Sequence, residues 1–129
     1  MKKLIKVFVI SMLITLTIGG TVSARQIDSF SHFRITTAWA ETRQLTKAKN
    51  DSQYVINLEL SRGLNINVKN RLVNSNDDAR SYDNLSECGY RYSYDNWAQA
   101  GYFYSLQMAR QNWWDGAAYI DGSWSPDES

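Results

Sequence analysis

Alternation of apolar and polar side chains is the feature that most restricts the fold of this chain. From Tyr54 to Leu60 apolar side chains occupy alternate positions, and the same pattern returns from Leu64 to Lys69. A period of two is typical of a strand with one buried face. The residues between the two runs, Ser61–Gly63, end in a glycine, which suits a tight turn. The pattern predicts a β-hairpin over residues 54–69 whose two apolar faces point to the same side.

Shorter alternations predict further strands on both sides of that hairpin. In the first, Phe33, Ile35 and Trp39 share one face. The expected strands are residues 30–39, 89–94, 100–110 and 117–120, with the turn signals Asp115-Gly116 and Asp121-Gly122 on either side of the last. Good helix formers between residues 97 and 112 leave a helix open as an alternative there. With one proline and frequent turn signals, the chain is predicted to be all-β, as an antiparallel sandwich or barrel.

Residues 71–85 are rich in Asn, Asp and Ser and are predicted to be a long surface connection. Asn74, Asn76 and Asp78 fall at alternate positions, as the first ligands of an EF-hand loop do. That loop also needs a glycine where Ala79 stands and a glutamate where Leu85 stands, so it is excluded. An Asx-rich turn is the favoured interpretation, with a looser cation site as the alternative. No metal site or cofactor is predicted.

The N-terminus predicts export. Basic residues, an apolar run from Leu4 to Ile18 and a Val22-Ser23-Ala24 ending have the layout of a secretory signal peptide, with cleavage after Ala24. Fifteen apolar residues are short for a span of the bilayer, although a retained anchor remains the alternative. The prediction is a signal peptide at residues 1–24 and a single secreted β-rich domain at residues 25–129.

The charge balance limits the classes of partner that this chain is expected to bind, and the cysteine content limits its disulfides. The mature domain would carry eleven basic and thirteen acidic side chains, a balance that argues against nucleic acid as a partner. Cys88 is the only cysteine, so no disulfide can form within the chain. It is interpreted as a small buried apolar residue, with a functional thiol or a bridge between chains as alternatives.

Aromatic residues concentrate between Trp97 and Pro126, which holds four of the five tryptophans. Such rings bury large areas, so this segment is expected to supply most of the core. Exposed rings could instead stack on sugars or enter a membrane interface. The candidate ligand-binding residues are Trp113, Trp114 and Trp124. Because neighbouring residues of a strand face opposite sides, one of the tandem pair is expected to be exposed.

The C-terminal third resembles a group of small exported proteins of Gram-positive bacteria that form an uncharacterised family. The resemblance lies in a tyrosine-rich strand, Gly101-Tyr102, the stretch Arg110-x-Asn112-Trp113 and, most specifically, the ending from Gly122 to Asp127, a GxWSPD pattern. It implies an all-β secreted domain and genes near export transporters or bacteriocin clusters. It implies no catalytic residues.

No catalytic motif is evident, so the chain is predicted not to be an enzyme. The expected function is contact with a cell-wall polymer, a membrane surface or another protein, in a bacteriocin-associated setting. The alternative is a secreted antimicrobial or toxin-like protein that acts on target envelopes. A small hydrolase with two carboxylates comes third, because sequence does not show how far apart acids lie in space.

Overall fold

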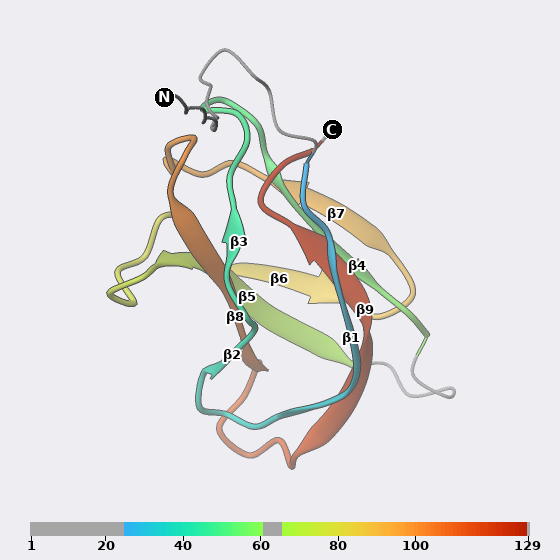
Figure 1. The fold of residues 1–129 in the computed structure, drawn as a ribbon. Coiled ribbons are helices and arrows are strands. Elements are labelled where there is room, and N and C mark those ends of the chain that lie inside the picture. Colours follow the sequence, from blue (N-terminus) through green and yellow to red (C-terminus); the bar gives the residue numbers. More distant parts are fainter. Residues whose placement is uncertain (1–24, 61–65, 129) are drawn as a thin grey trace, which may run out of the picture.

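The structure, a computed structural model, describes residues 25–60 and 66–128, and all regular secondary structure in them is β-strand (Figure 1). The strands are β1 (Asp28–Ile35), β2 (Ala40–Glu41), β3 (Leu45–Thr46), β4 (Tyr54–Leu58), β5 (Asn67–Asn74), β6 (Asn84–Glu87), β7 (Arg91–Tyr94), β8 (Phe103–Arg110) and β9 (Ala118–Ser125). The all-β prediction is confirmed. No described segment is a helix with the length and apolarity to cross a membrane. The expected signal peptide and the Ser61–Gly63 turn lie outside the described residues.

The strands form two antiparallel sheets that pack face to face, so the fold is sandwich-like. One sheet has the order β1-β9-β4-β7. The other has the order β2-β8-β5-β6, and β3 also pairs with β8. Strands distant in sequence, such as β1 and β9, lie side by side (Figure 1). The first and the last strand are therefore neighbours in one sheet.

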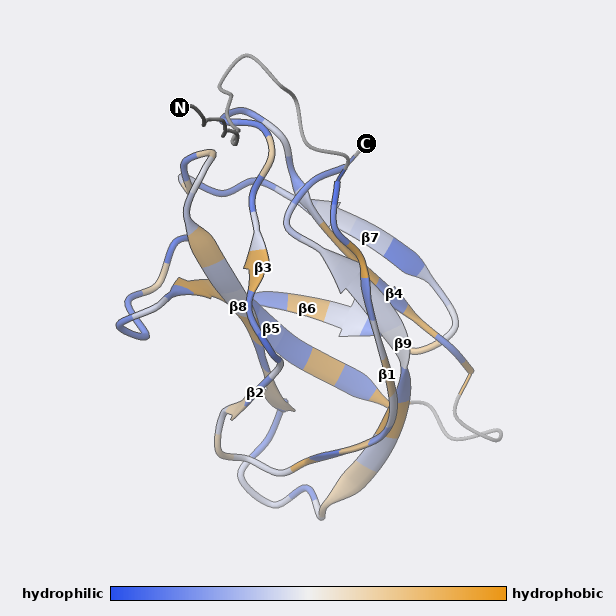
Figure 2. Cartoon of the chain, viewed as in Figure 1, coloured by the Kyte–Doolittle hydropathy of each residue, from blue (hydrophilic) through white to orange (hydrophobic). Residues whose placement is uncertain are grey.

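The core lies between the sheets and follows the alternation of the strands. Along β5, Val68 and Leu72 are fully buried, while Lys69 and Arg71 point away from the core. The change of hydropathy from residue to residue is visible along this strand in Figure 2. Asn70 is the polar exception on the inward face, and its Nδ2 donates to Ser86 Oγ at 2.9 Å. A buried amide is tolerated there because it is hydrogen-bonded.

The predicted hairpin over residues 54–69 is wrong. Most of its expected inward-facing residues are buried, but Leu60 is exposed. β4 pairs with β7 and β9, whereas β5 pairs with β6 and β8 in the other sheet. The two strands instead face one another across the core, where the Tyr54 hydroxyl donates to Asn70 Oδ1 at 2.7 Å. Alternation defines which side of a strand is buried, but it does not distinguish a neighbour in the same sheet from a strand in the facing sheet.

The first strand is shorter than predicted and contains a bulge. The register with β9 shifts between Phe30 and Phe33, and His32 has a φ of 53°. The extra residue turns both phenylalanines toward the core, with ring centroids 5.6 Å apart. β1 ends at Ile35, so the expected continuation to Trp39 is wrong: the Trp39 ring contacts Lys69 and Arg71 of the other sheet.

Two segments expected to be turns or loops belong to strands. The predicted surface connection over residues 71–85 is shorter than expected, because residues 71–74 are the end of β5 and residues 84–85 the start of β6. The Asp121-Gly122 pair, predicted as a turn, lies within β9. Gly122 is needed there because a Cβ would collide with the carbonyl oxygen of Asn57 on the neighbouring β4. The strand predicted over residues 100–110 is confirmed as β8, although it begins later, at Phe103, and the helix alternative is wrong.

Candidate functional site: an aromatic groove

The aromatic residues of the C-terminal third divide between the core and the surface. Trp124 and Tyr104 are buried. The expectation that this segment fills the core with its rings is wrong for most of the others, which are about half exposed or more: Trp97, Tyr102, Phe103, Trp113, Trp114 and Tyr119. So many exposed rings on one small domain are candidates for ligand contact.

Three of the exposed rings line one open groove of about 570 Å³. Trp97 is 51%, Tyr102 61% and Phe103 53% exposed. The polar side of the groove comes from the turn after β5, and the described lining residues are Asn74, Ser75, Asn76, Arg80, Trp97, Gln99, Tyr102, Phe103 and Tyr104. None of these is an Asp, Glu, His or Cys. Apolar walls with a few polar groups are typical of ligand sites.

The wall from residue 96 to 102 has no regular secondary structure but is held by hydrogen bonds. The Trp97 amide donates to the carbonyl oxygen of Arg80 at 2.9 Å. The Gln99 amide donates to the Tyr104 hydroxyl, also at 2.9 Å. The Gly101 amide donates to the Lys47 carbonyl, with Gly101 at a φ of 89° that favours glycine. The aromatic wall is thus fixed to both the β5–β6 connection and the segment after β3.

The opposite wall is an Asx turn. Asn74 Oδ1 accepts the backbone amides of Asn76 and Asp78, both at 2.9 Å. The Asn74 side chain therefore stabilises the backbone of its own turn, as the favoured interpretation of the sequence predicts. Within residues 25–60 and 66–128, no cluster of three or more His, Cys, Asp or Glu side chains is arranged to hold a metal ion.

Several polar groups of the groove are open to a ligand. The side chains of Asn76, Gln99 and Tyr102 make no hydrogen bond to any other described residue. An amide offers both donors and acceptors, and a phenol offers one of each. The groove therefore combines flat apolar surfaces with unpaired polar groups of both kinds.

Trp113 and Trp114 form a separate aromatic surface. They lie in the loop between β8 and β9, with exposed fractions of 83% and 65%, and their rings meet edge to face at 5.6 Å. The expectation that only one would be exposed is wrong, because the pair lies in a loop rather than a strand. The loop is held by Asp115, whose Oδ2 accepts the Asn112 amide at 2.8 Å. β8 separates this pair from the groove by eight residues, about 25 Å of strand.

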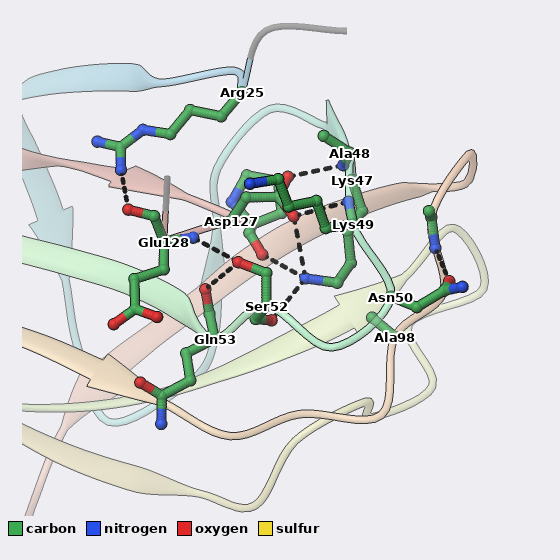
Figure 3. A network of polar contacts seen from close by, with 12 residues as sticks. Arg25, Lys47, Ala48, Lys49, Asn50, Ser52, Gln53, Ala98, Asp127 and Glu128 are labelled. Atoms are coloured by element: carbon green, nitrogen blue, oxygen red, sulfur yellow. Dashed lines mark hydrogen bonds and ion pairs between the residues drawn. The ribbon is translucent and has the colours of Figure 1, made fainter. Parts of the chain in front are cut away.

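Trp124 joins neither surface. It is 1% exposed in the core, so its ring cannot reach a ligand in this conformation. The ending that follows it has a structural role (Figure 3): Asp127 accepts the backbone amides of Ala48 at 2.7 Å and Lys49 at 3.0 Å. The Ser125 hydroxyl in turn accepts the Asp127 amide at 3.1 Å. The residues that carry the family resemblance therefore fasten the C-terminus to the segment after β3.

Cys88 and His32, the only cysteine and the only histidine of the sequence, do not line the groove. Cys88 is buried among apolar residues, and burial raises the pKa of its thiol. A raised pKa disfavours the reactive thiolate. His32 lies on the bulge of β1, where its ring stacks on Tyr119 at 4.0 Å.

Sequence reasoning missed the groove because its walls come from separate segments. Arg80 and Asn76 belong to a stretch that the sequence predicts to be a surface connection or, at Asn76, a loose cation site, and Trp97 belongs to the segment expected to fill the core. One signal was present: in Tyr102-Phe103-Tyr104 adjacent rings must face opposite sides of a strand, so at least one leaves the core.

Comparison with protein-family models, with curated proteins and with solved structures finds no match. The resemblance to small exported Gram-positive proteins rests on the quoted residues alone and stays a prediction.

Proposed function

We propose that residues 25–129 form a secreted, non-catalytic domain that binds a polysaccharide of the cell envelope in the aromatic groove. The observation that carries this proposal is the grouping of Trp97, Tyr102 and Phe103, each about half exposed or more, along one groove. Sugar rings present flat faces of C–H groups that stack on aromatic rings. Their hydroxyls need donors and acceptors, which Asn76 and Gln99 supply.

The chemistry of the groove favours binding over hydrolysis. In most families of glycoside hydrolases, two carboxyl groups flank the bond that is cleaved. The described lining residues include none. The proposal therefore assigns the groove to recognition of a polymer rather than to its cleavage.

The cellular setting comes from the sequence. The leader at residues 1–24 would deliver the domain outside the cell. The resemblance to small exported proteins of Gram-positive bacteria supports an envelope ligand and a bacteriocin-associated setting.

The test is binding of purified residues 25–129 to insoluble peptidoglycan, measured by co-sedimentation. Trp97→Ala should weaken binding at least tenfold, because it removes one stacking surface. Trp113→Ala is the matched control: it removes an exposed tryptophan outside the groove and should leave binding unchanged. Equal loss in both variants, release of soluble sugar, or no binding by the folded wild type would contradict the proposal.

A second candidate, a secreted antimicrobial that disturbs target membranes, is favoured by the Trp113–Trp114 surface. Two adjacent indoles at a loop tip suit insertion at a bilayer interface, where tryptophan is enriched. Its test is growth inhibition and dye release from vesicles. Replacing both residues with alanine should abolish both effects, whereas Trp97→Ala should not. A wild-type protein inactive in both assays would exclude this candidate.

A further inference from the structure

Arg80 is the only charged side chain among the described residues that line the groove. Its backbone is fixed on both sides. The Arg80 amide donates to the Leu72 carbonyl at 2.7 Å, and its own carbonyl accepts the Trp97 amide at 2.9 Å. The backbone of Arg80 is thereby held next to that of Trp97, and both residues line the groove.

No acid among the described residues forms an ion pair with this guanidinium. The ion pairs in the described part of the chain involve Arg43, Lys47 and Arg110 as the cations. Asp77 and Asp78 lie in the adjoining turn, but neither forms an ion pair with Arg80. Within residues 25–60 and 66–128, the guanidinium makes one hydrogen bond, from Nη1 to the carbonyl oxygen of Ala79, at 2.9 Å.

The remaining N–H groups of Arg80 are therefore available to an acceptor in the groove. A guanidinium presents five donors in a planar fork that matches a carboxylate or a phosphate. A neutral sugar would leave this charge without a partner, whereas an anionic sugar unit would pair with it while its ring stacks on Trp97. The two groups together offer one apolar and one cationic contact to the same ligand.

We infer that the groove selects an anionic glycan, whose carboxylate or phosphate group binds Arg80. This inference rests on the proposed function, since it specifies the class of polysaccharide that the same groove would take. The shared chemistry is a negatively charged oxygen group attached to a polyol or sugar chain. A carboxylated amino sugar and a polyol phosphate both have it.

Isothermal titration calorimetry with two matched tetrasaccharides tests the inference. One contains four N-acetylglucosamine units, and the other alternates N-acetylglucosamine with N-acetylmuramic acid, which adds carboxylates to the same backbone. The second should bind about tenfold more tightly at low salt, because charged hydrogen bonds are the stronger ones. The difference should shrink as salt is raised. A glycerol phosphate oligomer in a third titration distinguishes phosphate from carboxylate as the preferred group.

Variants assign the effect to Arg80. Arg80→Gln should remove the preference for the charged ligand and leave affinity for the neutral tetrasaccharide as in the wild type. Arg34→Gln, which removes the same charge from an exposed position on β1, should keep the preference. Circular dichroism melts confirm that both variants are folded.

The outcomes separate this inference from the proposed function. Equal affinity of the wild type for charged and neutral glycans, with loss of both in Trp97→Ala, would overturn the selection by Arg80 and leave glycan binding intact. Preference for either the carboxylate or the phosphate ligand, abolished in Arg80→Gln, would support it. If the folded wild type binds none of the three ligands, both proposals fail.

Discussion

Lys47 Nζ lies 3.3 Å from Asp127 Oδ1, and both side chains are completely buried (Figure 3). The ammonium also donates to the carbonyl oxygens of Pro126, at 2.6 Å, and Ser52, at 2.8 Å. Burial lowers the pKa of Lys47, and the Asp127 carboxylate opposes that shift. The pair joins the C-terminus to the interior of the domain.

Removing one member of this pair should be costly. Asp127→Ala leaves the Lys47 ammonium buried without its counter-charge and two backbone amides without their acceptor. Breaking a buried ion pair in this way costs about 3–5 kcal/mol. Urea denaturation of residues 25–129 at pH 7 measures the loss in the free energy of unfolding.

A double variant provides the control. Lys47→Met combined with Asp127→Ala removes both charges. The double variant should therefore lose less free energy of unfolding than Lys47→Met and Asp127→Ala lose in sum when each is measured alone. Additive losses would show that the two side chains do not stabilise one another.

Gly122→Ala should destabilise the domain. A Cβ at this position would collide with the backbone of Asn57, which a change of rotamer cannot relieve. Forced repacking of this kind costs about 1–3 kcal/mol. Gly116→Ala is the matched control: nothing lies within 4 Å of its Cβ, so thermal unfolding should be unchanged. Equal melting temperatures for both variants would contradict the close approach of β4 and β9.

Local patterns predicted the strands better than their partners. Alternation identifies the buried face of β4 and of the start of β5, because burial of one face is a property of each strand alone, but the second half of β5 was predicted to be a connection. Their pairing depends on contacts between distant segments, such as β4 with β9, which no local pattern encodes. The Asp121-Gly122 pair does not form the predicted turn for a related reason. Its glycine is required because the backbone of Asn57, on the neighbouring strand, lies too close for a side chain.

The candidate site was only partly predictable. The sequence shows that rings are abundant near the C-terminus, but it does not show which of them the sandwich leaves outside. Trp124 lies on the inward face of a strand, while Trp113 lies in a loop. The groove needs Arg80 beside Trp97, and that proximity comes from one backbone hydrogen bond between residues 17 positions apart.

The contrast between these tryptophans gives a direct test of their placement. Trp124→Ala should lower the free energy of unfolding by about 3–5 kcal/mol, because it leaves a large cavity in the core. Trp113→Ala, at an exposed loop position, should stay within about 0.5 kcal/mol of the wild type. Urea denaturation compares the two. A large loss for Trp113→Ala would mean that the tip is packed against a surface.

Stability at high pH should depend on Tyr54. Burial raises the pKa of its hydroxyl well above the ordinary value of 10.0. Above pH 10.0 the unfolded chain loses the hydroxyl proton of Tyr54 while the folded chain keeps it, so the unfolded state binds fewer protons. The free energy of unfolding must then fall as pH rises.

Tyr54→Phe isolates this contribution. At pH 7 the variant should be less stable by about 1–3 kcal/mol, because Asn70 and Asn84 lose the hydroxyl as a partner. Between pH 10.5 and 11.5 the wild type should lose about 1.4 kcal/mol more per pH unit than the variant, the value for one proton. Burial raises the pKa of Tyr94 as well, but that tyrosine is present in both proteins and does not affect the comparison. Urea denaturation across this range gives both slopes, and parallel slopes would show that Tyr54 ionises as readily in the folded domain as in the unfolded chain.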